Sequence, residues 1–219
     1  MRIARSTAAG IITGIVLLAV VVGFAVGLPE ATGGKDLPKL PDRLDSRFVA
    51  LSAVTPEDGG ATSSAGAEQI KAFAASAQAS EKKARKRLGE LYGEAEVRSY
   101  LDLPATVAGN PQARPAQFSV TVVPGDAGLV IPSGPFEIDG AQTGAHYELT
   151  EIDGYLCSKL WSDPVDPMTG LPTGLEPSGD SYQVECRAER GGLTYDIYSS
   201  GLDPEETAHY LDLVLRRTA

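Results

Sequence analysis

An uncharged apolar stretch near the start of the chain limits most strongly what the protein can be. Residues 8–28 contain no Asp, Glu, Lys or Arg. As a helix, this stretch would reach about 31 Å, which matches the hydrocarbon core of a bilayer. Arg2 and Arg5 precede it, which favours an N-terminus in the cytoplasm. We therefore expect a single-pass protein of the cell membrane, with residues 1–7 as a cytoplasmic stub and the chain after residue 28 outside.

A cleaved signal peptide is the alternative interpretation, because Ala25 and Gly27 suit the small-residue positions before a cut at Leu28. An ordinary signal peptide has only about 7–15 apolar residues, so the longer stretch favours an anchor that is retained. Both interpretations export the same domain. Within the anchor, Ala19, Gly23 and Gly27 form a stripe of small residues. Such stripes let two membrane helices pack closely, so a homodimer is one interpretation. The alternative is that glycine is simply common in membrane helices.

The charge of the exported chain restricts its partners. Residues 93–219 carry 7 Lys and Arg against 20 Asp and Glu. Affinity for nucleic acid rests mostly on Lys and Arg side chains that neutralise phosphates. An acidic domain of this kind therefore excludes nucleic acid from the expected partners.

Composition divides the exported part into a tether and a domain. Residues 29–65 combine several Pro and Gly with mixed charges and little periodicity, which predicts a flexible tether. From residue 66 to 92, apolar residues recur at helical spacing, with Ser64 as a cap and Gly93 as a stop. We therefore expect an extracytoplasmic domain over residues 66–219 that opens with a long helix.

That helix carries a dense basic run, formed by Lys82, Lys83, Arg85, Lys86 and Arg87. A solvated helix face is the simplest explanation for it. The alternatives are contact with the acidic domain, with an anionic polymer of the cell envelope, or with anionic lipid head groups.

The pattern beyond Gly93 is one of strands and turns. Residues 117–123 alternate apolar and polar side chains, which predicts a half-buried strand. Two hairpins follow, over residues 147–161 and 182–198, with turns at Asp153-Gly154 and Gly191-Gly192. Such dipeptides suit tight hairpin turns because they tolerate positive φ angles.

The chain ends in a helix with clear start signals. Asp203 is placed to cap it, Pro204 suits its first position, and Glu206 completes a capping box. Together the patterns predict an α+β fold, in which an antiparallel sheet with two hairpins is covered by the long basic helix and the C-terminal helix.

Cys157 and Cys186 are the two cysteines, each near the centre of a predicted hairpin arm. In an exported chain a disulfide is the expectation, and two reduced core thiols are the alternative. Closing a loop of about 30 residues would stabilise the fold by about 3.6 kcal/mol in the chain-entropy model. The bridge would hold the two hairpins together.

The chain lacks motifs for nucleophilic catalysis, phosphate binding or dinucleotide binding. Neither histidine has a partner at metal-ligand spacing, so no metal or other cofactor is expected. An enzyme would have to gather carboxylates from the Pro- and Gly-rich stretch 162–180, namely Asp163, Asp166 and Asp180, with His146 into a deep pocket.

Aromatic residues on the hairpins beside this stretch are candidates for a recognition surface. They are Tyr155, Trp161, Tyr182, Tyr195 and Tyr198. Cross-strand tyrosines that pack a small core would produce the same pattern.

The order of anchor, tether, basic helix, strands and a closing helix that starts around residues 201–206 resembles single-pass envelope proteins of GC-rich bacteria. The resemblance implies no activity. We expect a non-enzymatic, membrane-tethered extracytoplasmic module that binds a protein or an anionic polymer of the envelope. The alternative is a carboxylate-dependent envelope hydrolase.

Overall fold

The computed structural model describes residues 36–108, 115–126, 128, 137–139, 144–175, 177 and 179–218. Residues 37–219 form one compact unit. The predicted anchor at residues 8–28, with its stripe of Ala19, Gly23 and Gly27, lies outside the described residues. Across the part of the chain that is described, no helix is both long and apolar enough to span a bilayer.

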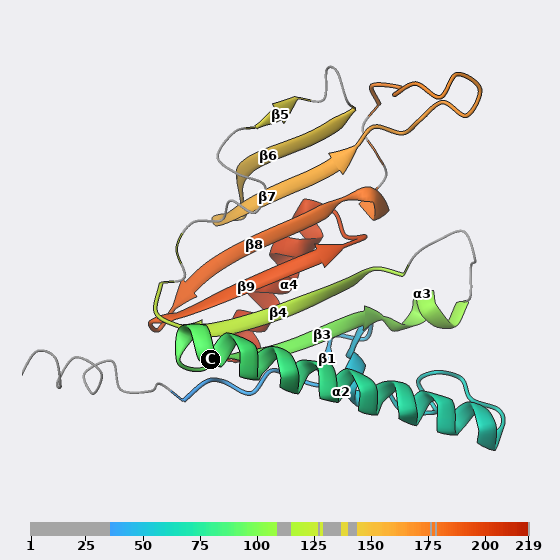
Figure 1. The fold of residues 1–219 in the computed structure, drawn as a ribbon, viewed down its shortest axis with the longest axis vertical. Helices are drawn as coiled ribbons and strands as arrows, with labels where there is room; N and C mark the ends of the chain where they lie inside the picture. The colour runs from blue at the N-terminus through green and yellow to red at the C-terminus, as the bar shows by residue number, and fades with distance from the viewer. Residues whose placement is uncertain are drawn as a thin grey trace, which may run out of the picture. The chain divides into compact units, whose positions relative to one another are not determined.

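The unit is built on one antiparallel sheet of nine described strands, in the order β1-β2-β3-β4-β9-β8-β7-β6-β5 (Figure 1). The strands are β1 Arg43–Leu44, β2 Phe48–Ala50, β3 Glu96–Asp102, β4 Gln117–Pro124, β5 Ile138–Asp139, β6 Ala145–Ile152, β7 Tyr155–Ser162, β8 Gln183–Arg190 and β9 Leu193–Ser200. Three α-helices accompany them, α2 Ser64–Tyr92, α3 Leu103–Ala108 and α4 Pro204–Arg217, with 3₁₀ turns at Leu51–Ala53 and Gly179–Ser181. The predicted α+β class and antiparallel sheet are confirmed.

Both predicted hairpins are present with the predicted turns. β6 and β7 are joined at Asp153 and Gly154, whose φ angles are 52° and 84°. β8 and β9 are joined at Gly191 and Gly192, with φ angles of 62° and 75°. Turns with positive φ at both central residues match the twist of paired strands. Sequence reasoning missed β3, whose charged and apolar residues do not alternate clearly.

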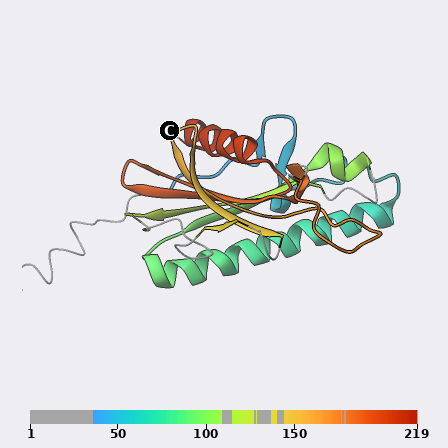
Figure 2. The same cartoon turned by 90° about the horizontal axis from the view of Figure 1, so that it is seen from above.

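Helix α4 covers one face of the sheet and α2 lies on the opposite face (Figure 2). On the α4 side, Val120, Ile197 and Leu211 are fully buried and contribute to the core. Asp203 caps α4 by accepting a hydrogen bond from the backbone N–H of Glu206 at 2.7 Å. The Glu206 carboxylate instead accepts from Arg47 Nη1 at 2.6 Å. The predicted capping box is therefore only half formed, because Arg47 competes for the glutamate.

Helix α2 begins at Ser64, so the residue predicted as its cap is the first residue of the helix. Ser63 is the cap and accepts a hydrogen bond from the N–H of Gly66. Gly93 ends the helix with a φ of 89°, as predicted. The helix packs against the 3₁₀ turn at Leu51–Ala53 and against β3, where the carboxylate of Glu81 accepts from the N–H of Ser99 at 3.2 Å.

The predicted flexible tether over residues 29–65 is wrong for its second part, because residues from Leu37 onward belong to the compact unit. Leu40, Leu44 and Phe48 are fully or almost fully buried, and β2 pairs with β3. The Phe48 ring lies 4.8 Å from that of Phe118 and 4.7 Å from that of Tyr210, measured between centroids. The tether prediction failed because this segment buries apolar residues without strand or helix periodicity.

The cysteines form the predicted disulfide. Cys157 in β7 and Cys186 in β8 are directly opposite each other, with their Cα atoms 4.1 Å apart. Both are buried on the α4 side of the sheet. The bridge joins the first hairpin to the second, as expected from the sequence.

Candidate functional site

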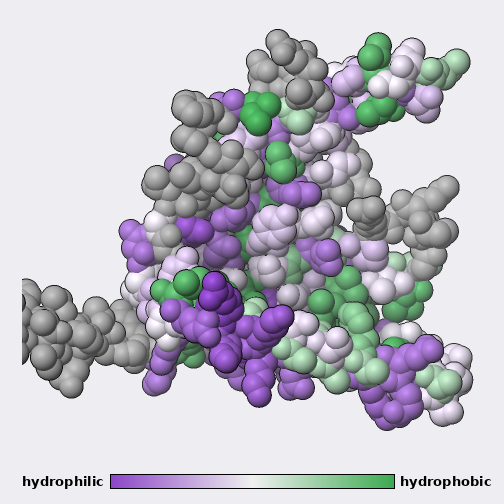
Figure 3. Space-filling model, viewed as in Figure 1, coloured by the Kyte–Doolittle hydropathy of each residue, from purple (hydrophilic) through white to green (hydrophobic). Residues whose placement is uncertain are grey.

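The most exposed apolar surface of the described chain lies on the loop that follows β7. We call residues 163–175 the apolar loop. Its apolar side chains point into solvent, with exposed fractions of 58% for Val165, 94% for Met168, 64% for Leu171 and 64% for Leu175. Figure 1 shows the loop extending beyond the sheet at the upper right, and Figure 3 shows hydrophobic side chains at that end. Several large apolar side chains exposed on one short segment are typical of interaction sites.

Backbone hydrogen bonds give this loop a defined conformation. Asp166 is central to it: its N–H donates to the carbonyl of Leu171 at 3.0 Å and its own carbonyl accepts from Gly170 at 2.8 Å. The Asp166 carboxylate accepts from the N–H of Met168 at 2.7 Å. Val165 pairs with Pro172 in an isolated β-bridge. The apolar side chains are therefore held outward by an ordered backbone.

The base of the loop is fixed against the start of β6. The N–H of Asp163 donates to the carbonyl of Gly144 at 2.7 Å. Gly144 has a φ of 64°, and a Cβ at this position would lie 2.8 Å from Cγ of Pro172. Such a contact is too short for a side chain, so glycine allows the loop to lie directly on β6.

An aromatic and charged cluster lies beside this base. His146 Nε2 is 2.7 Å from Asp163 Oδ1, and its ring stacks on Trp161 with centroids 4.8 Å apart. The ring of Tyr182 also packs against Trp161, with the two ring centroids 5.8 Å apart. Lys159 Nζ lies 5.4 Å from the Trp161 centroid and forms an ion pair with Glu148 at 2.8 Å. We call these residues the aromatic cluster.

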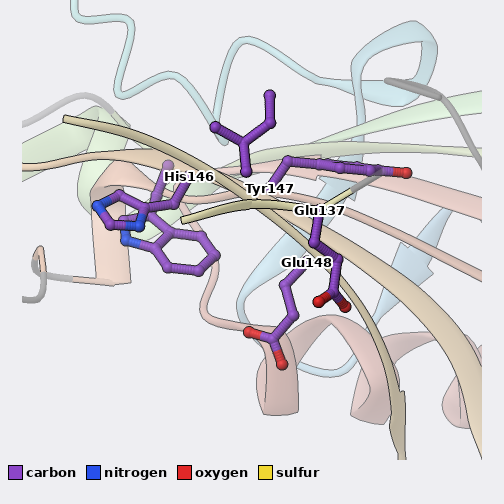
Figure 4. Close-up of a pocket in the computed structure, with 6 residues that line it drawn as sticks. Glu137, His146, Tyr147 and Glu148 are labelled. Carbon is purple, nitrogen blue, oxygen red and sulfur yellow. The ribbon is translucent and has the colours of Figure 1, made fainter. Parts of the chain in front are cut away.

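An open pocket of about 610 Å³ adjoins the aromatic cluster at the β5–β6 edge. Its lining includes Glu137, His146, Glu148 and Trp161. Figure 4 shows the side chains of Glu137 and Glu148 next to each other, with Tyr147 directed elsewhere. The pocket is wide and polar on one side, which suits a surface contact better than an enclosed substrate.

One histidine–carboxylate pair lies in this region among the described residues. Of the acids predicted for a hydrolase, Asp163 reaches His146, whereas Asp166 is used by the turn of the apolar loop. The side chain of Asp180 lies outside the described part of the structure. No nucleophilic side chain is bonded to His146 among the described residues, and the same residues hold no group of three or more potential metal ligands.

The five aromatic residues predicted as one recognition surface do not lie on one surface. Tyr195 is buried in the core, and the hydroxyl of Tyr155 donates to Asp212 of α4. Tyr198 lies three residues beyond Tyr195 and so points to the opposite face of the sheet. Only Trp161 and Tyr182 are brought together. Strand alternation separates Tyr198, whereas Tyr155 and Tyr195 lie on the α4 side of the sheet and are covered by α4 or buried in the core.

The structure divides the basic run of α2. Arg85 faces the sheet and pairs with Glu96 of β3 at 3.0 Å. Lys82, Lys83, Lys86 and Arg87 are exposed. Figure 3 shows a strongly hydrophilic patch over this end of the helix.

Sequence reasoning missed a half-buried charge cluster on the face of the sheet opposite α4. Arg187 of β8 donates to Glu185 at 3.2 Å and to Asp196 of β9 at 3.0 Å. Burial, followed by the charge of Asp196, raises the pKa of Glu185 to about 7. Glu185 and Arg187 share a face because they are two residues apart in β8, whereas Asp196 joins them only through the register of β8 and β9, which the sequence does not state.

Sequence reasoning also missed the apolar loop as a surface. Its signal was the presence of Val165, Met168, Leu171 and Leu175 among prolines and glycines, where no regular element can bury them.

Comparison of the chain with protein-family models, with curated proteins and with solved structures found no match.

Proposed function

We propose that the chain is a membrane-tethered, non-enzymatic binding module that contacts a protein of the cell envelope through its apolar loop. The observation that carries the proposal is the set of apolar side chains that an ordered backbone holds in solvent, with Met168 94% exposed. Leaving such side chains in water forgoes about 1.5–3 kcal/mol for each large residue that a partner could bury. A partner that covers them would recover this free energy.

The charge around the loop narrows the chemistry of the partner. Residues 163–180 carry four acidic residues and no Lys or Arg. A negatively charged membrane surface would repel this segment. The favoured partner is therefore a protein with an apolar depression and a basic rim. The aromatic cluster at the base of the loop supplies a rigid, partly polar border for such a contact.

Placement outside the membrane is supported by the disulfide between Cys157 and Cys186, because disulfides persist in oxidising compartments. Anchoring is supported by the apolar stretch at residues 8–28. The alternative, a carboxylate-dependent hydrolase, has less support, because it would rest on the His146–Asp163 pair alone.

The test compares partner recovery for two variants of the full-length protein, after chemical crosslinking in intact cells. We expect Met168→Ser/Leu171→Ser to reduce the yield of the crosslinked partner at least tenfold, since two buried anchors would be lost. Leu156→Ser is the matched control, because Leu156 is 62% exposed but lies at the other end of β7. Equal yields from both variants would contradict the proposal.

A further inference from the structure

The outward face of α2 gathers four cations. Lys82, Lys83, Lys86 and Arg87 are exposed, and at about 100° per residue they span about 140° of the helix surface. Glu81 and Arg85 occupy the opposite side, where they contact β3. The four exposed cations therefore lie on one side of the helix and form a single positive stripe. We call it the basic face.

Few counter-charges neutralise the basic face. Among the described residues, Glu90 forms an ion pair with Arg87 at 3.2 Å, and this pair is exposed. No ion pair is observed for the three lysines within the described part of the chain. Exposed pairs contribute little stability, so the basic face has no evident role in folding.

Apolar side chains continue the same helix beyond the cations. Leu91 is 61% exposed and Tyr92 46% exposed. At about 100° per residue, Leu91 lies about 40° beyond Arg87 and borders the basic face, whereas Tyr92 lies on the side of Glu81. Cations bordered by an exposed aliphatic residue are found where helices contact the interfacial region of a bilayer.

The length of the connection keeps this domain close to any bilayer that residues 8–28 enter. The compact unit begins at Leu37, so residues 29–36 alone connect it to the apolar stretch. Eight extended residues span about 28 Å at most. This is much shorter than the tether expected from the sequence.

The chain enters the compact unit beside the strand that carries α2. The carbonyl of Leu40 accepts from Arg98 of β3 at 2.9 Å, and the next residue of that strand, Ser99, donates to Glu81 of α2. Figures 1 and 2 both show the first described residues and the C-terminal end of α2 at the same end of the sheet. The entry point and the C-terminal end of α2 therefore lie at the same end of the sheet, with Leu40 packed on the α4 side and α2 on the other face.

We propose that the basic face of α2 rests on anionic phospholipid at the membrane surface and so orients the domain. The inference rests on the anchoring included in the proposed function. Lipid is favoured over a soluble polymer because the short connection keeps the face near the bilayer, and because the exposed Leu91 borders it with an apolar contact. Each Lys or Arg near an anionic surface strengthens the contact about fivefold.

The test measures lysine acylation of the full-length protein in lipid nanodiscs, with mass spectrometry as the readout. One set of discs is pure phosphatidylcholine and the other contains about one third phosphatidylglycerol. We expect Lys82, Lys83 and Lys86 to react at least tenfold more slowly in the anionic discs, and about 0.5 M salt to remove this protection. Lys159, which shares the α4 side with Cys157 and Val184, should react equally in both.

Arg87→Gln keeps the three lysines as reporters and should weaken their protection about fivefold. Arg217→Gln is the matched control, because Arg217 is exposed on α4 at the other face of the sheet. Equal acylation in neutral and anionic discs would overturn the proposal. So would protection that appears without lipid and rises with protein concentration, or that requires a soluble polyanion. Failure of the chain to remain in either disc would instead contradict the anchoring.

Discussion

Glu185 shows how a single residue can make the stability of the sheet depend on pH. Its carboxyl group is partly buried between strands, with Arg187 donating to it and Asp196 close by. Burial and the charge of Asp196 raise its pKa to about 7. In the unfolded chain the pKa would return to its ordinary value near 4.5. Between these two values the folded protein binds more protons, so stability should fall as the pH rises.

The predicted variant is Glu185→Gln, which keeps an oxygen that accepts from Arg187 but cannot ionise. At pH 5 the variant and the natural protein should have similar free energies of unfolding. At pH 8 the variant should be more stable by at most about 2 kcal/mol, after allowance for solvent screening. Urea unfolding at both pH values measures the difference. Glu151→Gln is the control, since Glu151 is exposed. A difference that does not change with pH would rule out this account.

At the level of elements, the disulfide links the two hairpins covalently. β7 and β8 are separated in sequence by the apolar loop, and the bridge joins them at directly opposed positions. It thereby fixes the strand from which the loop departs and the strand to which it returns. The loop conformation is expected to depend on it.

The prediction at this scale concerns Cys157→Ala/Cys186→Ala. Removing the bridge should lower the free energy of unfolding by about 2–4 kcal/mol, because a loop of about 30 residues regains its entropy in the unfolded chain. Denaturant unfolding with and without reductant measures the effect. Reductant should destabilise the natural protein and leave the double variant unchanged. Alkylation of both cysteines in the unreduced natural protein would show that no bridge forms.

Elements with clear local signals could be predicted from the sequence. The hairpins were predicted because Asp153-Gly154 and Gly191-Gly192 allow one kind of turn. The start of α4 was predicted from Asp203 and Pro204. By contrast, β1 and β2 have no such signal. They are strands because β3 and the aromatic side chains of the core are available to them, and this depends on contacts between distant residues.

In the candidate site, too, some features could be predicted from local sequence signals and others depend on contacts between distant residues. The sequence supplied His146, Asp163 and the basic run as individual candidates. It could not show that Asp163 reaches His146 or that Arg85 turns toward Glu96, because these outcomes are decided by strand register and by helix orientation. The opposite facing of Tyr195 and Tyr198, by contrast, follows from their spacing in one strand.

At the scale of the whole molecule, the structure moves the start of the domain from residue 66 to Leu37. The segment it adds buries Leu40, Leu44 and Phe48 against the α4 side of the sheet. Arg47 strengthens the join by donating to Asp102 of β3 and Glu206 of α4, both at 2.6 Å. The segment is therefore part of the folding unit.

Truncation tests this boundary. A protein that starts at residue 37 should unfold cooperatively, whereas one that starts at residue 55 should lose about 5 kcal/mol or more, because three large buried side chains are missing. Thermal unfolding followed by circular dichroism distinguishes the two. Identical unfolding transitions would contradict this boundary and indicate that residues 37–54 are a tether.

The central claim, that the apolar loop is the surface at which the tethered domain binds a protein, is tested most directly by site-specific photo-crosslinking in intact cells. A photoreactive residue at position 168 or 171 should give one discrete protein adduct, and the same residue at position 156 or 198 should give none. Adducts of equal yield from all four positions, or adducts with lipid alone from positions 168 and 171, would contradict the claim.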